Sequence, residues 1–279
     1  MIGILSALVA ALGYGVSDFV GGIASRRVAA LRVVIVSYPV ALVLLTVVAF
    51  PFGGELSTPA LLWGLLAGVS QAFGVWWFYA ALGSGPISVV SPLTAILVAG
   101  IPVLAGLTLG ERPTVLAGLG AAVALIAVVL VSQVNSVGSP HRFTQKVAWL
   151  TVGSGVAFGM NFVILDQVPP EANLWPLVFG RLASTAIVLL AALLTANLVL
   201  ERGIPLRLAF LAGALDTVAN IATLLALQSS LLSLAGVLVA LYPAATVVLA
   251  IAVLREKVTR WQSVGMVLAL AAVAMITAG

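Results

Sequence analysis

Long apolar runs separated by short polar breaks fill the chain from end to end. A helix that crosses a bilayer needs about 20 mainly apolar residues, and ten runs reach or approach that length. Barrel strands are excluded, because these runs show no alternation of apolar and polar positions. The ten predicted spanning helices cover residues 2–23, 29–51, 60–82, 86–109, 114–133, 147–166, 174–198, 206–228, 231–254 and 261–278.

The pattern repeats at half the length of the chain. Glu111 and Glu256 each follow an apolar, proline-containing run and lie 145 positions apart. Offsets of 145 or 144 also match Gln71 with Asp216, Ser88 with Ser233, and Tyr14 with Phe158. Such self-similarity identifies a duplicated unit. The predicted domains are a first five-helix repeat at 1–135, a cytoplasmic linker at 136–146 and a second five-helix repeat at 147–279.

Five helices per repeat is an odd number, so the second repeat must cross the membrane in the opposite direction to the first. Basic residues near helix ends mark the cytoplasmic side, and ten of the 12 Lys and Arg residues fall on one side of this arrangement. They are Arg26, Arg27, Arg32, Arg142, Lys146, Arg202, Arg207, Arg255, Lys257 and Arg260. We therefore predict an all-α protein of the cytoplasmic (inner) membrane, with inverted repeats around a central cavity and both termini outside.

The composition agrees with a lipid environment. Hydrophobic residues make up 63% of the chain and charged residues 7%, against roughly 25% charged residues in soluble domains. A net charge of +4 would suggest nucleic acid in a soluble protein, but here the basic residues set orientation, so no nucleic-acid partner is expected. The chain has no cysteine, which excludes disulfides and thiolate metal sites. We expect no cofactor and no metal.

Ionisable side chains inside a spanning helix usually mark a functional pathway. Asp216 lies ten residues into the eighth predicted helix, about 15 Å deep, and Arg181 lies within the seventh. Neutral polar groups from both repeats share the pathway. The predicted substrate-binding residues are Tyr14, Gln71, Tyr79, Asn161, Arg181, Asp216 and Asn220.

Each charged residue also has a structural interpretation. Asp216 and Arg181 can pair as an internal brace, or Arg181 can extend to the outer interface. Asp18 lies two turns before the basic pair that follows the first helix, which favours an ion pair at the headgroups over a ligand contact. Glu111 and Glu256 are expected to cap the N-termini of the helices that follow them.

If the polar groups converge, they suit a small amphipathic or zwitterionic metabolite. Arg181 would bind a carboxylate bidentately, while Asp216 would take an ammonium group or a coupling proton. A carboxylate removed from water holds a proton more readily than one in water, so Asp216 is the candidate for proton coupling.

Several short motifs resemble the ten-helix, EamA-type family of the drug/metabolite transporter superfamily. They are Gly13-Tyr14-Gly15, Tyr79-Ala80-Ala81-Leu82, Ser91-Pro92-Leu93, Leu109-Gly110-Glu111-Arg112, Phe179-Gly180-Arg181 and Arg255-Glu256-Lys257. The resemblance implies a basket of ten helices, with helices 1, 3, 4, 6, 8 and 9 lining the cavity and helices 5 and 10 at the periphery. It also implies export or uptake of amino acids, other metabolites or drugs. The ninth helix departs from the pattern, with Val237 in place of the proline at Pro92.

The sequence therefore predicts a secondary transporter for a small organic solute, working by alternating access, either proton-coupled or as a passive exchanger. Its expected partners are the solute, the lipid bilayer and protons, and its expected state is a monomer or weak homodimer. The alternatives are a membrane-embedded transferase or a structural subunit. A transferase would need a cluster of catalytic side chains, and the single histidine, His141, lies in the linker. We assign no catalytic residue.

Overall fold

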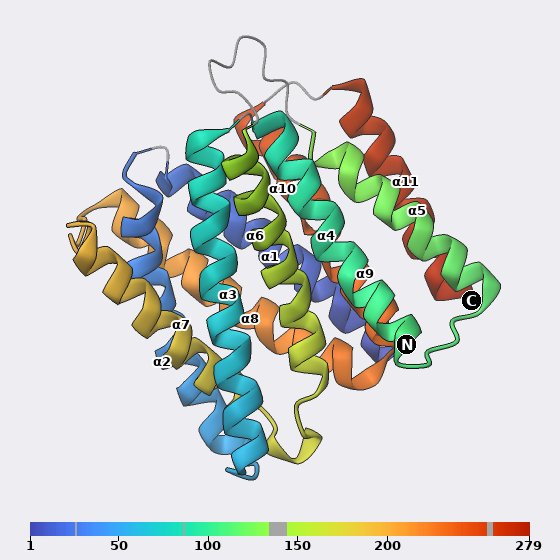
Figure 1. Cartoon of the computed structure of the whole chain (residues 1–279), viewed down its shortest axis with the longest axis horizontal. Helices are drawn as coiled ribbons and strands as arrows, with labels where there is room; N and C mark the ends of the chain where they lie inside the picture. Colours follow the sequence, from blue (N-terminus) through green and yellow to red (C-terminus); the bar gives the residue numbers. More distant parts are fainter. Residues whose placement is uncertain (26, 86, 134–143, 256–258) are drawn as a thin grey trace.

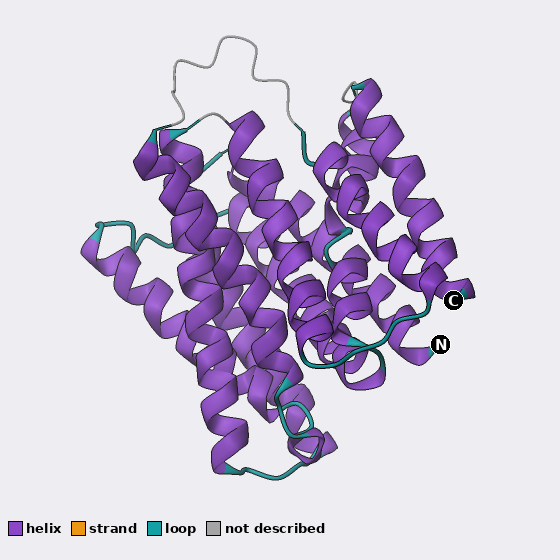
Figure 2. Cartoon of the chain, turned by 45° about the vertical axis from the view of Figure 1, so that its right-hand side comes forward, coloured by secondary structure: helices purple, strands orange, loops and turns teal. Residues whose placement is uncertain are grey.

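A computed structural model describes residues 1–25, 27–85, 87–133, 144–255 and 259–279. Throughout these ranges the chain is helical, without strands (Figure 2). The helices are α1 (Ile2–Ser25), α2 (Ala30–Phe52), α3 (Thr58–Ser84), α4 (Ile87–Thr108), α5 (Val115–Val131), α6 (Gln145–Asp166), the 3₁₀ helix η1 (Pro170–Ala172), α7 (Trp175–Leu194), α8 (Ile204–Ser229), α9 (Leu232–Val239), α10 (Tyr242–Leu254) and α11 (Arg260–Ala278).

The ten predicted spans are present as ten apolar helical segments of the described chain. Nine are long enough to cross a membrane, with α9 and α10 together counting as one, and α5 is apolar but has 17 residues. The ninth span is not the continuous helix that the sequence suggested. It breaks at Ala240 and Leu241, and α10 restarts with Pro243 in its first turn. Proline lacks the backbone N–H of a helix interior but is well placed in a first turn.

Side chains next to the helices set where several of them begin. The hydroxyls of Ser57, Thr114, Thr144 and Thr259 each accept a hydrogen bond from the backbone N–H three residues later. At α11 the side chain of Gln262 also accepts from the N–H of Thr259, which completes a capping box. These caps satisfy N–H groups that have no partner inside a helix.

Contacts between connections show which helix ends share a face of the protein. Arg32 and Glu201 form a salt bridge of 2.8 Å, which joins the start of α2 to the connection before α8. We call this side the linker face. The backbone N–H of Glu55 donates to the carbonyl of Glu171 at 2.9 Å on the opposite side, the termini face, where both chain ends lie (Figure 1). The predicted linker lies mostly outside the described residues, as do Arg26, Arg142, Glu256 and Lys257.

The two five-helix repeats are related by a pseudo-two-fold axis. Gly15 of α1 packs against the backbone of Tyr242 and Thr246, and its repeat mate Gly159 packs in the same way against Leu97 and Ile101. These partners are themselves mates at an offset of 145. Because each repeat crosses the membrane an odd number of times, the second runs inverted to the first.

Other repeat-related contacts agree with this axis. Gly120 of α5 packs against Met275 and Ile276, while its mate Gly265 packs against Leu130 and Val131. Small residues let helix backbones approach closely in membranes. Helices α5 and α11 pack mainly on each other at the edge of the bundle, as the resemblance implied (Figure 1).

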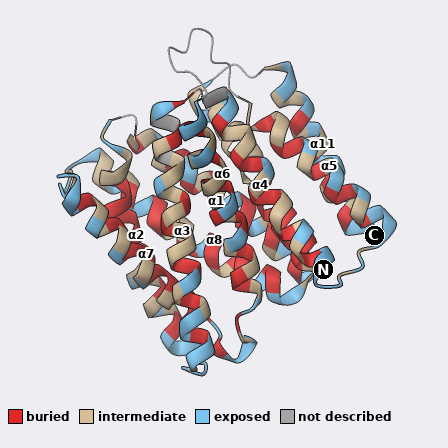
Figure 3. Cartoon of the chain, viewed as in Figure 1, coloured by how far each residue is buried: buried red, intermediate tan, exposed pale blue. Residues whose placement is uncertain are grey.

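Apolar packing closes the half of the bundle toward the termini face. The largest buried cluster draws on both repeats, and Leu224, Leu232 and Leu238 within it are no more than 1% exposed. Exposed residues lie on the outer surfaces of the helices (Figure 3). Many of them are large apolar residues, as a lipid-facing surface requires. The other half of the bundle, toward the linker face, contains the cavity.

Candidate functional site

A cavity of about 480 Å³ lies between the repeats and is lined by residues of both. Repeat mates line it from both sides: Tyr14 with Phe158, Asp18 with Phe162, Gln71 with Asp216, Thr94 with Val239, and Val98 with Pro243. Its walls come from α1, α2, α3, α4, α6, α8, α9 and α10. Helix α2 was not among the cavity helices that the resemblance implied, and it contributes Ser37 and Tyr38.

The cavity extends from mid-depth to the linker face. Its lining includes Ser25 at the end of α1, Ala30 at the start of α2, Ser91 in the first turns of α4 and Ser132 after α5. All four positions belong to the linker face. Among the described residues, the apolar cluster fills the other half, so the cavity extends toward the linker face and not toward the termini face.

One ion pair lies at the inner end of this cavity. The Nη2 atom of Arg181, in α7, donates to a carboxylate oxygen of Asp216, in α8. The guanidinium also lies over the ring of Tyr38, 4.6 Å from its centroid. The Arg181 side chain is 2% exposed and that of Asp216 is 19% exposed. Asp216 therefore lines the cavity while Arg181 lies behind it, held by a salt bridge and a cation–π contact.

Amide side chains lie on the side of this ion pair that faces away from the cavity. Gln71, Asn161 and Asn220 line a narrow crevice together with Arg181. The amide of Asn220 donates to the backbone carbonyl of Asp216 at 2.7 Å, one turn earlier in α8. That of Asn161 donates to the carbonyl of Ala67 at 2.7 Å and so ties α6 to α3. Gln71 lines both the crevice and the cavity.

A family profile described as the EamA-like transporter family matches residues 1–133 and 145–278. The chain belongs to the EamA-like transporter family. A solved structure titled only "Crystal structure of protein" has the same fold, with a TM-score of 0.79, 18% identity, and coverage of 99% of this chain and 96% of that one. Comparison with curated proteins finds no match. As a member of this family, the chain is a multi-pass membrane transporter and not an enzyme.

The structure of this EamA-like transporter brings most of the predicted substrate-binding residues together. Tyr14, Gln71, Asn161 and Asp216 line the cavity. Arg181 and Asn220 do not line it and lie in the crevice behind Asp216. Tyr79 belongs to α3, but its side chain is outside the described part of the structure.

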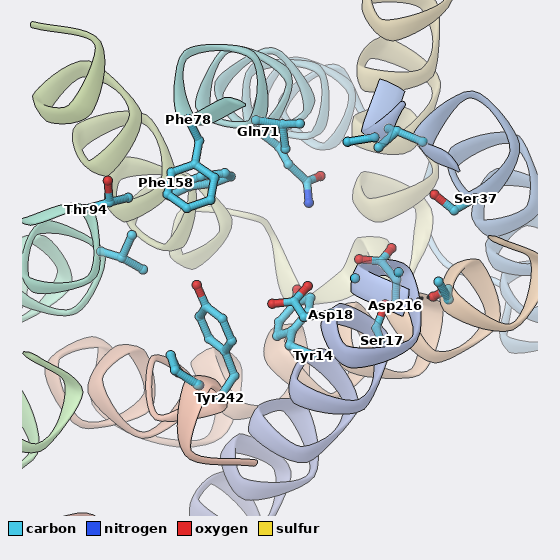
Figure 4. A pocket seen from close by; sticks show the side chains of 18 of the residues that line it. Tyr14, Ser17, Asp18, Ser37, Gln71, Phe78, Thr94, Phe158, Asp216 and Tyr242 are labelled. Carbon is cyan, nitrogen blue, oxygen red and sulfur yellow. Dashed lines mark hydrogen bonds between the residues drawn. The ribbon is translucent and has the colours of Figure 1, made fainter. Parts of the chain in front are cut away.

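Asp18 is the cavity residue that sequence reasoning assigned to another role. Of its two expected partners at the headgroups, Arg27 forms no salt bridge with it, and Arg26 lies outside the described residues. Its carboxyl group instead faces the cavity, near that of Asp216 (Figure 4). Asp18 lies near the end of its helix, and from this position we expected it at the membrane surface. The cavity, however, extends to that end of the helix.

Tyr38 and Tyr242 were also missed, although the sequence contains a signal for both. Each directly precedes a proline inside a predicted span, Pro39 and Pro243. Such prolines mark places where a helix is interrupted, and interrupted helices line the binding sites of many transporters. At the second of these places the ninth span breaks, and Tyr242 enters the cavity from the restart.

Glu111 caps a helix N-terminus, but not that of the helix which follows it. Its carboxylate accepts from the backbone N–H groups of Leu232, at 2.5 Å, and Ser233, at 3.0 Å, at the start of α9. The turn after α4 in the first repeat is thereby joined to the second repeat at the termini face. The N-terminus of α5 is capped by Thr114. The predicted equivalent, Glu256, is outside the described residues.

Proposed function

We propose that this transporter moves a small organic solute, such as an amino acid, an amphipathic metabolite or a drug-like compound, by alternating access. The observation that carries the proposal is the cavity, whose described lining residues come from both repeats and extend to the linker face but not to the termini face. Ligand sites commonly have volumes of 300–1,000 Å³ with mainly apolar walls and a few polar groups. Inverted repeats can exchange conformations, so that the same cavity opens first to one side and then to the other.

The Arg181–Asp216 pair is the proposed link between ligand binding and this exchange. Removing the counter-charge from one partner of a buried ion pair destabilises the protein by several kcal/mol. A proton or a substrate ammonium group that reaches Asp216 from the cavity competes with Arg181 for the carboxylate. Releasing Arg181 alters the contact between α7 and α8 and, through Tyr38, that with α2. This gives Asp216 the coupling role, while Arg181 and the amides act from behind the cavity.

The orientation of the protein follows from its charges. Among the described residues, the linker face bears Arg27, Arg32, Lys146, Arg202, Arg207, Arg255 and Arg260. The termini face bears one basic residue, Arg112, with Glu55, Asp166 and Glu171 nearby. Basic connections remain in the cytoplasm. We infer that the linker face is cytoplasmic, that both termini are outside the cytoplasmic membrane, and that the cavity is therefore open to the cytoplasm.

The exposed surface of the bundle supports our expectations about lipid, other protein copies and nucleic acid as partners. Large apolar side chains such as Leu66, Leu190 and Leu270, on α3, α7 and α11, are exposed. We propose that this surface contacts lipid, that the protein works as a monomer or a weak homodimer, and that nucleic acid is not a partner.

Reconstitution of the purified protein into proteoliposomes tests the proposal. A panel of radiolabelled amino acids, amines and amphipathic drugs is assayed with and without a pH gradient. We expect uptake or exchange of at least one class, loss of activity in Asp216→Asn and Arg181→Gln, and an unchanged rate in Glu55→Gln, which removes an exposed carboxylate far from the cavity. Activity and a pH-gradient effect that persist in Asp216→Asn would refute the coupling role.

A further inference from the structure

In the part of the chain that the structure describes, the charged residues that line the cavity are both acidic. Asp18 and Asp216 both line it, no described lining residue is basic, and Arg181 is paired with Asp216 in the crevice behind it. Within the described part of the chain, Asp18 has neither a salt bridge nor a hydrogen bond from another side chain. A carboxylate inside a membrane protein is costly unless it meets a cation or a proton. Among the described residues that line the cavity, Asp18 is therefore a carboxyl group without a paired cation.

The surroundings of Asp18 suit an organic cation better than a bare metal ion. The rings of Tyr14 and Tyr242 meet edge to face, 6.3 Å apart, and both line the cavity. Phe78 and Phe158 form a second edge-to-face pair, also 6.3 Å apart, on another wall. Aromatic rings attract ammonium groups, most strongly where water is excluded. Figure 4 shows Asp18, Asp216 and the hydroxyl of Tyr242 around one space, with Gln71 reaching in from the opposite side.

A buried hydroxyl group in the cavity wall is a second candidate for contact with a ligand. Thr94 of α4 lines the cavity and is 5% exposed, and its Oγ1 atom has no hydrogen-bond partner among the described residues. Buried polar groups are rarely left unpaired in proteins. An amine N–H or a hydroxyl at the other end of a bound solute would satisfy it.

The two repeats place different side chains at equivalent positions of this site. The mate of Asp18 in the second repeat is Phe162, which lines the opposite wall. A solute with a charged end and an apolar end therefore meets two different walls at related positions. Its charged nitrogen would lie toward α1, and its apolar body would lie toward α6.

Building on the transport function proposed above, we propose that Asp18 is the cation-binding group of this cavity, and that the solutes carried have a positively charged nitrogen attached to an apolar or aromatic body. A zwitterion meets this condition through its ammonium group. Asp216 keeps its separate role in coupling. When Asp18 holds the ammonium group, the proton is the ligand that competes with Arg181 at Asp216.

The absence of cysteine from the chain allows a direct binding test. A Ser91→Cys variant places one thiol in the cavity wall near its mouth. Its labelling by a maleimide is followed in detergent while three probes of similar size compete: benzyltrimethylammonium, benzyl alcohol and phenylacetate. The quaternary ammonium carries no exchangeable proton, so protection by it reports binding of the cation alone. Asp18→Asn, Asp18→Glu and the control Glu55→Gln are compared in this background.

We expect benzyltrimethylammonium to protect the thiol at a concentration about tenfold lower than either other probe. Asp18→Asn should raise that concentration about tenfold, and Asp18→Glu and Glu55→Gln should keep the preference for the cation. Equal protection by the three probes, protection by none of them, or an unchanged cation preference in Asp18→Asn would overturn the proposal. The carboxylate-retaining Asp18→Glu variant gives a reading even if Asp18→Asn does not fold.

The result of this binding experiment is independent of whether the transport proposal is correct. Binding is measured without any need for movement across a membrane. Cation protection that depends on Asp18, in a protein that moves none of the solutes in proteoliposomes, would leave the site standing and refute transport. Uptake of neutral or anionic solutes with no effect of Asp18→Asn would do the reverse.

Discussion

Glu111 offers the sharpest test of how the termini face stays closed. Its carboxylate accepts two backbone hydrogen bonds at the first residues of α9, Leu232 and Ser233. Its own N–H donates to the carbonyl of Gly106 at 2.9 Å, which holds the turn in place. The contact joins the two repeats at the closed face. We expect Glu111→Gln to destabilise this conformation relative to the one in which that face is open.

The size of the effect follows from the lost bonds. Glutamine keeps one acceptor oxygen and turns an NH₂ group toward the second backbone N–H, so one charge-assisted hydrogen bond is lost, at about 1.5–3 kcal/mol. The negative charge at the start of α9 is lost as well, at about 0.3–1 kcal/mol. Since Gln retains part of the first bond, we expect a change of about 2 kcal/mol, or about 30-fold in the ratio of the two conformations.

Two single-cysteine reporters measure this ratio. Ser233→Cys places a thiol at a position that is 1% exposed near the closed face, and Ser91→Cys places one in the open cavity. In Glu111→Gln, maleimide labelling should become faster at position 233 and slower at position 91. Glu55→Gln removes an exposed carboxylate from the same face and should change neither rate.

Unchanged rates at both reporters, in Glu111→Gln and also in Glu111→Ala, would contradict this reasoning. They would show that the buried apolar cluster alone keeps the termini face closed. Faster labelling at both positions would indicate a loosened protein instead of a shift between two conformations, and would refute the prediction equally.

Three further predictions concern the ion pair, helix packing and orientation. Arg181→Gln leaves the Asp216 carboxylate without its cation, so the thermal midpoint in detergent should fall by the equivalent of about 3 kcal/mol, and Arg181→Gln with Asp216→Asn should recover part of it; equal losses would argue against the pairing. A Cβ at Gly68 would overlap the carbonyl of Gly180, so Gly68→Ala should cost about 1–3 kcal/mol, whereas Gly118→Ala, with open space around it, should change the midpoint little. In cells, a cysteine at Glu55 should react with an impermeant maleimide and one at Arg202 should not, and the opposite pattern would reverse the proposed orientation.

Much of the candidate site could be found from polarity and depth alone. Asp216, Gln71 and Tyr14 were predicted to share a pocket, and all three line the cavity. The reasoning succeeds because a polar group is rarely placed inside a membrane helix without a partner or a role. It could not tell that Arg181 lies behind the cavity, because depth along a helix does not show in which direction a side chain points.

The sequence by itself determined the lipid environment, the number of spans, the duplication and its inversion. These properties depend on composition, on the spacing of breaks and on the charge of the connections, all of which can be read along one dimension. Only the tertiary structure decided that α2 lines the cavity, that Asp18 faces it, and that Glu111 crosses to the other repeat. The reason is physical: lipid is about as apolar as a protein interior. The pattern of apolar residues along a membrane helix therefore does not mark the face that turns inward.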